Sequence, residues 1–336
     1  MRHNAFRQHD CILTGLMLLL LMGLASCSSN LPAPALRSTT TATPATSDAQ
    51  AHNDEGLECV AQGDYDCALT HYDQAIQLKP DWAELYDNRG LAYAARGDYE
   101  RALADWDQAL RLQPNLADAF LNRGVLYYKN ADFEHALADL NQAILLQPAD
   151  AEAVYMRGRV YSDKGDYDRA IADFDQVIRA LPNNTMAYIA RGIAYRRKGD
   201  LARALADYDR AIQLKPNDPE AYYNRGNVFS DRHDWERAIT DYDQAQKLSP
   251  KLVNVYINRG IAYTNKGDLD RAIADLDQAI KLQPDRAEAY YNRGIAYAQK
   301  KENLKAILDF QRSIELSHDP DFIKQVDEQM NSLGAH

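Results

Sequence analysis

Small and apolar residues recur along most of this chain with a constant period of 34 residues. A glycine marks each period, an alanine follows it, and a proline closes seven of the eight periods. The glycines are Gly56, Gly90, Gly124, Gly158, Gly192, Gly226, Gly260 and Gly294. A fixed period of this length, kept without insertion, predicts an array of identical supersecondary units that stack on one another.

The order of residues within one period predicts two antiparallel helices. In residues 83–116, aromatic side chains flank Gly90 at spacings that place them on one helical face. We expect Gly97 to end this first helix in a left-handed conformation and Asp98 to cap the next one. Trp106 then faces inward from the second helix. Gly90 would be small because the two helices cross closely there.

This pattern of aromatic, glycine, alanine and proline positions resembles the tetratricopeptide repeat. The resemblance implies an all-α fold, a right-handed superhelical solenoid of eight antiparallel helix pairs over residues 49–320. The repeats would be 49–82, 83–116, 117–150, 151–184, 185–218, 219–252, 253–286 and 287–320. An apolar stripe after them predicts a C-terminal capping helix over 321–336, formed by Phe322, Ile323, Val326, Met330 and Leu333.

The first 48 residues have a different composition. Residues 1–26 combine two arginines with a short apolar core, as a secretory signal peptide does. The core ends in Leu24-Ala25-Ser26-Cys27, which resembles the lipobox of bacterial lipoproteins and implies a lipid on Cys27. An ordinary signal peptide cut nearby, or an uncleaved anchor, stays open as an alternative. Residues 27–48 are rich in Ser, Thr, Pro and Ala, which predicts a disordered tether.

The lipoprotein resemblance also predicts where the protein lies. We expect the cell envelope, with the chain attached to the membrane only through its lipid. In a diderm source, Ser28 after the cysteine implies the outer membrane and a periplasmic orientation. In any other source, the extracytoplasmic face of the cell membrane is expected.

The formal net charge is −11, which argues against nucleic-acid or anionic-membrane binding through the folded part. The acidity either serves solubility alone or favours a basic partner, and both interpretations stay open. The chain lacks the common nucleotide-binding and hydrolase motifs, and its eight histidines are dispersed without the spacing of metal ligands. We therefore predict no catalytic residue, no metal site, no cofactor and no small-molecule substrate.

Two charged residues recur in phase with the glycines. An arginine precedes the glycine in repeats two to eight, and an aspartate recurs on each second helix. The first repeat has Glu55 and His71 at these two positions instead. Their joint loss suggests that the arginine and aspartate pair as bidentate contacts between packed helices. A generally irregular end repeat is the alternative explanation.

The first repeat also contains two cysteines. Cys59 and Cys67 flank the predicted helical turn almost symmetrically, so their Cα atoms are expected to lie close together. An oxidising envelope would permit a disulfide between them. Two buried thiols that fill apolar positions are the alternative.

In the tetratricopeptide family, ligands contact the first helices of the repeats, and those positions give a predicted peptide-binding groove. An asparagine side chain can hold an extended peptide backbone, because its amide both donates and accepts hydrogen bonds. Alternatively, Asn-Arg-Gly is a consensus sequence of this repeat subtype and has no role in binding. The predicted groove residues are Asn88, Asn122, Tyr223, Asn224, Asn227, Ile257, Asn258, Tyr291 and Asn292.

These features predict a non-catalytic, membrane-anchored scaffold that binds protein partners, with a basic or neutral segment favoured. An acidic residue at the second position of several repeats, such as Glu84, Asp118 and Glu152, supports the charge preference. The alternative is a pilotin-like assembly factor for a pilus or secretion channel. An enzyme or solute-binding receptor is a remote third hypothesis.

Overall fold

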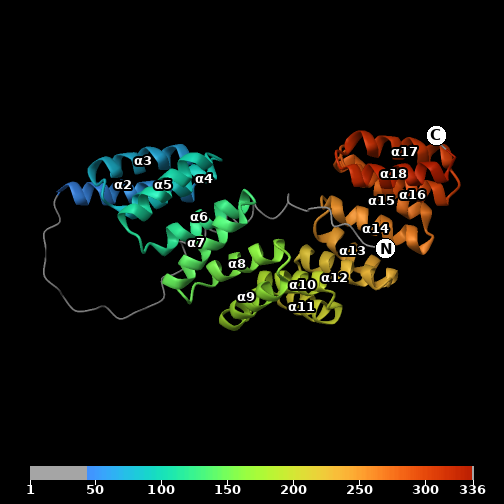
Figure 1. The fold of residues 1–336 in the computed structure, drawn as a ribbon, viewed down its shortest axis with the longest axis horizontal. Helices are drawn as coiled ribbons and strands as arrows, with labels where there is room; N and C mark the ends of the chain where they lie inside the picture. Colours follow the sequence, from blue (N-terminus) through green and yellow to red (C-terminus); the bar gives the residue numbers. More distant parts are fainter. Residues whose placement is uncertain (1–43, 335–336) are drawn as a thin grey trace. The chain divides into compact units, whose positions relative to one another are not determined.

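The computed structural model describes residues 44–334, which form 17 helices and no strand within that range. The helices follow one another in antiparallel pairs (Figure 1), which confirms the predicted all-α repeat fold. The chain divides into two compact units, one up to Gly165 and the other from Asp166 onward. The predicted signal peptide, Cys27 and most of the predicted tether lie outside the described residues.

Unit 1 contains seven helices. They are α2 (Pro44–Ala61), α3 (Tyr65–Leu78), α4 (Ala83–Ala95), α5 (Tyr99–Leu112), α6 (Ala117–Lys129), α7 (Phe133–Leu146) and α8 (Ala151–Asp163). The first of these begins at Pro44, ahead of the repeat boundary predicted at residue 49. Proline suits the first position of a helix because it has no N–H to leave unpaired and its φ is already helical.

Unit 2 contains ten helices. They are α9 (Tyr167–Ala180), α10 (Thr185–Lys198), α11 (Leu201–Leu214), α12 (Pro219–Asp231), α13 (Trp235–Leu248), α14 (Val253–Lys266), α15 (Leu269–Leu282), α16 (Ala287–Gln299), α17 (Asn303–Leu316) and α18 (Pro320–Ser332). The helix α18 is the predicted cap. Its Phe322 and Val326 are buried against Phe310 of α17, so the last repeat does not expose its apolar face.

The turns inside the helix pairs are built as the sequence predicts. Gly97 has a φ of +84° and its N–H donates to the carbonyl of Ala94 at 3.1 Å. Asp98 then caps α5, because its side chain accepts the N–H of Arg101. Three turns hold the same left-handed conformation without glycine, at Ala131, His233 and Lys301. Each of these residues costs about 1–2 kcal/mol relative to a relaxed backbone.

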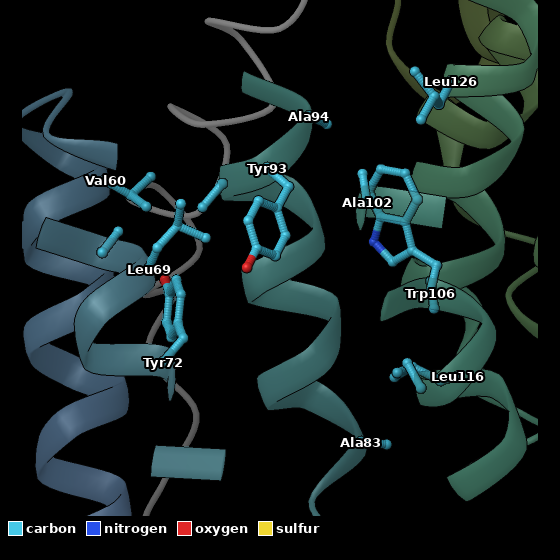
Figure 2. Close-up of a cluster of buried hydrophobic side chains, with 14 of the residues drawn as sticks. Val60, Leu69, Tyr72, Ala83, Tyr93, Ala94, Ala102, Trp106, Leu116 and Leu126 are labelled. Atoms are coloured by element: carbon cyan, nitrogen blue, oxygen red, sulfur yellow. The ribbon is translucent and has the colours of Figure 1, made fainter. Parts of the chain in front are cut away.

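The core lies between the two helices of each pair and between neighbouring pairs. Figure 2 shows it in unit 1, where Trp106 and Tyr72 lie among apolar side chains from α2 to α6. A Cβ atom added to Gly90 would lie 2.8 Å from Nε1 of Trp106. This position therefore tolerates only glycine without movement of the indole, which is the close crossing that the sequence predicts.

The two helices of a pair occupy different layers. In unit 1, α2 contacts α4, α4 contacts α6, and α6 contacts α8; in unit 2, α10, α12, α14 and α16 form the same chain of contacts. Second helices do not approach one another as closely within either unit. First helices therefore line the inner side of each unit, which is where repeat arrays present a binding surface.

Among the described helices, none combines the length and apolar character that crossing a membrane requires.

Candidate functional site

An ionic clamp fixes the position of the inner helices. Arg89 on α4 donates from Nε and Nη2 to both carboxylate oxygens of Asp105 on α5, at 2.8 and 2.7 Å. The same bidentate pair recurs five more times, so the predicted pairing is confirmed there. These further pairs are Arg123–Asp139, Arg191–Asp207, Arg225–Asp241, Arg259–Asp275 and Arg293–Asp309.

Each clamp also reaches back into the preceding repeat, which sequence reasoning missed. Nη1 of Arg89 donates to Asp73 on α3 at 2.6 Å, so one guanidinium joins α3, α4 and α5. The signal was available, because an aspartate holds this position on six of the eight second helices, from Asp73 to Asp277. The third repeat has Asn141 there, and Asn141 accepts a hydrogen bond from Arg157. The last repeat, which no arginine follows, has Gln311 at this position.

Most of the predicted groove asparagines are engaged inside the protein. Asn88 donates to Asn53 at 2.9 Å and Asn122 donates to Asp87 at 3.0 Å, each across a repeat boundary. Asn258 donates to Asn227 at 2.8 Å and to the hydroxyl of Tyr223 at 3.1 Å. These amides join adjacent first helices, which favours the structural reading of the Asn-Arg-Gly pattern.

The remaining groove predictions in unit 2 also lie in crowded places. Ile257 is 5% exposed and Asn224 is 8% exposed, and Asn224 donates to the carbonyl of Glu220. Asn292 donates in the same way to the carbonyl of Glu288. Tyr291 is half-buried, with its ring edge-on to Phe322 of the cap. These side chains offer a partner little surface.

Unit 1 instead presents a row of carboxylates at the start of its inner helices. We call Glu84, Asp87, Asp118, Asp150 and Glu152 the acidic face. Glu84, Asp118 and Glu152 lie in the first turns of α4, α6 and α8, where each side chain is exposed on one side and packed against protein on the other. Within residues 44–334, no lysine or arginine forms an ion pair with any of the five.

The carboxylates of the acidic face disturb one another. Loss of water contact, together with the charges of Asp150 and Glu84, raises the pKa of Asp118. The pKa of Glu152 is raised by the same loss of water contact and by Asp150 and Asp118. Burial raises the pKa of Asp87 to about 7, against the hydrogen bond from Asn122.

These shifts separate two explanations of the acidic face. A carboxylate placed only to favour a helix N-terminus is stabilised in its charged form, so its pKa falls. For Asp87, Asp118 and Glu152 the pKa rises instead, first because water contact is lost and then because neighbouring carboxylates repel one another, so their charged forms carry a cost in free energy. A cation that approached the acidic face would relieve this cost.

The inner surface of unit 2 differs at the equivalent positions. Met186 and Asn254 interrupt the row, and Glu288 is paired with Arg286. A concentrated negative potential at the start of the inner helices is therefore a property of unit 1.

The first repeat carries two more features. Cys59 of α2 and Cys67 of α3 are joined by a disulfide, with their Cα atoms 5.8 Å apart. Beside it, His52, Glu55 and His71 lie within hydrogen-bonding distance of one another, although the sequence analysis treated the histidines as dispersed. His52 and Glu55 are three residues apart on α2, and His71 lies on α3, so their spacing in the sequence matches no familiar metal-binding motif. Only the packing of α2 against α3 brings the three side chains together.

Sequence profiles of tetratricopeptide repeat families match the chain from residue 56 to residue 319. The matches described as "Tetratricopeptide repeat" cover residues 121–185, 155–219, 190–261 and 287–319, and those described as "TPR repeat" cover 56–95, 90–130 and 262–301. The chain is a tetratricopeptide repeat protein. No curated protein sequence matches it.

Solved structures support the fold of this tetratricopeptide repeat protein. The APC/C hetero-tetramer Cut9-Hcn1 is similar with a TM-score of 0.60 and 18% identity, over 82% of this chain and 55% of that chain. Yeast Tom70 is similar with a TM-score of 0.57 and 17% identity, over 96% of this chain and 73% of that chain. A tetratricopeptide repeat protein from Parabacteroides merdae is similar with a TM-score of 0.52 and 21% identity, over 83% of this chain and 97% of that chain. This chain thus spans about half of the Cut9-Hcn1 chain, and these likenesses concern the fold alone.

Tetratricopeptide repeat proteins generally mediate protein–protein interactions, and the fold is typically a non-catalytic scaffold.

Proposed function

We propose that this tetratricopeptide repeat protein is a non-catalytic scaffold that binds a basic segment of a partner protein on the acidic face of unit 1. The observation that carries the proposal is the row of partly exposed carboxylates Glu84, Asp118 and Glu152 in the first turns of α4, α6 and α8. Within residues 44–334 none of the three forms an ion pair with a lysine or arginine, and the raised pKa values of Asp118 and Glu152 support the proposal. Lysine or arginine side chains of a partner would pair with these carboxylates and remove their mutual repulsion. Electrostatic complementarity of this kind selects partners and speeds association.

The charge preference is testable with peptides of one length and opposite composition. We expect the full chain to bind an extended lysine-rich peptide, and to bind a glutamate-rich peptide not at all, in fluorescence anisotropy. The variant Glu84→Gln/Asp118→Asn/Glu152→Gln removes three charges without changing side-chain size. It should weaken binding about tenfold, since three partly exposed charge contacts contribute about 0.5 kcal/mol each.

A matched control removes the same charge elsewhere in unit 1. Asp66, Glu100 and Glu134 also lie in first helical turns, but on second helices. The variant Asp66→Asn/Glu100→Gln/Glu134→Gln should bind the lysine-rich peptide as the wild type does. Equal weakening by both variants would mean that only net charge matters, and the acidic face would lose its assignment.

We further propose that a lipid on Cys27 holds this scaffold at a membrane of the bacterial cell envelope. The support is the sequence Leu24-Ala25-Ser26-Cys27 after an apolar core. Two acyl chains give stable anchoring, because each buried CH₂ contributes about 0.8 kcal/mol. Cys27→Ser should move the protein from the membrane fraction to the soluble fraction and abolish labelling by an alkyne fatty acid. Ser28→Ala is the control, and unchanged labelling of Cys27→Ser would refute the anchor.

A further inference from the structure

Three side chains that the proposed partner binding does not use converge in the first repeat. His52 and Glu55 lie one turn apart on α2, and His71 reaches them from α3. The Nδ1 atoms of both histidines lie 3.0 Å from the same oxygen, Oε2 of Glu55. The two Nδ1 atoms are 3.4 Å from each other. We call these three residues the His–Glu–His cluster.

The separations of these three atoms suit one small cation. The circle through them has a radius of about 1.8 Å, shorter than the Zn–N and Zn–O distances of about 2.0–2.2 Å, so one position lies at bonding distance from all three. Their mean separation is also close to the edge of a tetrahedron around Zn²⁺, about 3.3 Å. Two imidazoles and a carboxylate are a ligand set that zinc sites use, with solvent in the fourth position.

Hydrogen bonding alone accounts less well for this arrangement. If both imidazoles donate from Nδ1 to Glu55, two N–H groups face each other across 3.4 Å. If one of them does not donate, its lone pair faces the carboxylate oxygen. A divalent cation removes both conflicts, because it accepts a lone pair from each of the three atoms.

Comparison with the other repeats shows what the first repeat has exchanged. Where Arg89 and Asp105 form the clamp of the second repeat, the first repeat has Glu55 and His71. Substitution by small neutral residues would suffice if the end repeat merely dispensed with a clamp. Instead, the two positions hold Glu55 and His71, whose side chains can ligate a metal ion, and His52 supplies a third possible ligand beside them.

Solvent can reach the cluster, and the adjacent disulfide does not compete with it. The side chains of His52, Glu55 and His71 are 31%, 52% and 27% exposed. Cys59 and Cys67 also lie near His71, but sulfur ligates zinc as a thiolate and not as a disulfide. With the disulfide formed, His71 is left to the His–Glu–His cluster.

We propose that His52, Glu55 and His71 bind one divalent transition-metal ion, with Zn²⁺ as the probe of choice. The site joins α2 to α3 and uses no residue of the acidic face. It is independent of the proposed partner binding.

The test is a competition between the full chain, without a histidine tag, and a chromophoric zinc chelator. We expect one Zn²⁺ per chain. His52→Ala, His71→Ala and Glu55→Gln should each weaken binding by at least the 10–100-fold that loss of a mere supporting contact costs at metal sites. Glu55→Gln retains the shape of the side chain and one accepting oxygen, so it separates loss of a charged ligand from misfolding. Far-UV circular dichroism checks all variants.

The chain supplies a matched control in His135. Its Nδ1 also faces a carboxylate, that of Asp132 at 2.7 Å, but there is no third ligand in the described residues around it. His135→Ala should bind Zn²⁺ as the wild type does. Absence of stoichiometric binding, or equal affinity of the wild type and His52→Ala, overturns the proposal.

Cobalt distinguishes the two overlapping sets of ligands. The Co²⁺-loaded wild type should lack a thiolate charge-transfer band. The variant Cys59→Ser/Cys67→Ser should bind Co²⁺ with the same affinity as the wild type. A thiolate band, or loss of binding in the double cysteine variant with binding retained in His52→Ala, assigns the metal to the cysteines and overturns the proposal.

Discussion

Replacing Asp207 by alanine is expected to lower the free energy of unfolding by about 3–5 kcal/mol, because it leaves the Arg191 guanidinium without its main partner in a largely buried place. Asp207 is 5% exposed and accepts from Nε and Nη2 of Arg191 at 2.9 and 2.6 Å. The hydrogen bonds from this guanidinium to Asp207 raise the pKa of Arg191, so the arginine stays charged. The aspartate and arginine therefore act as a unit.

A double-mutant cycle measures the coupling energy between Arg191 and Asp207. Arg191→Ala, Asp207→Ala and the double variant are compared by urea unfolding, with hydrogen exchange of α10 and α11 as a local readout. We expect a coupling energy of at least about 2 kcal/mol. The exposed pair Arg203–Asp200 at the start of α11 is the control, and its coupling should be much smaller because solvent screens the two charges. Equal coupling in the two pairs would contradict a structural role for the clamp.

The second large effect is a pH dependence at Asp87. This carboxyl binds its proton up to a pKa of about 7 in the folded protein, because it is buried, but only up to about 3.9 in the unfolded chain. Between these values the folded state binds more protons, so stability falls as pH rises. The contribution of the Asp87 carboxyl to the free energy of unfolding is fully present below pH ~4. It falls by about 1.4 kcal/mol per pH unit above that and is lost by pH ~7.

Asp87→Asn should remove most of this slope, because an amide does not titrate and its oxygen still accepts from Asn122. At pH 8 the variant is expected to be more stable than the wild type by about 3–4 kcal/mol, while near pH 4 the two should agree. Urea unfolding of unit 1 at pH 4, 6 and 8 provides the measurement. Asp48→Asn, an exposed aspartate on α2, is the control. A pH slope that is unchanged in Asp87→Asn would assign it to other groups.

The repeat pattern made the fold predictable because each position has one physical task. Gly90 must be small under Trp106, Gly97 must accept a positive φ, and Asp98 must cap a helix. These requirements are local to one helix pair, so a single chain reveals them when it repeats the same residues in most of its eight units. The Arg–Asp pairs were predictable for the same reason, since their joint absence from the first repeat linked them.

The binding surface was less predictable because exposure depends on the neighbouring repeat. Asn122 and Asn258 occupy ligand-contacting positions of the family, but their amides reach residues about one repeat away in the chain. Ile257 is another predicted groove residue, and it is buried. The sequence shows the acidic residues one by one, whereas the raised pKa of Asp118 depends on loss of water contact and on the charges of Asp150 and Glu84. Only the packed helices bring those charges together.

The clamp that reaches back into the preceding repeat has a consequence for assembly between molecules. Stacking the first repeat of one chain on the last repeat of another would extend the array into a filament. Such a joint would need an arginine at residue 55 and an acidic partner at residue 311, and the chain has Glu55 and Gln311 there. The helix α18 also covers the apolar end of the last repeat. The first and last repeats therefore lack both halves of the ionic contact that joins neighbouring repeats within the array.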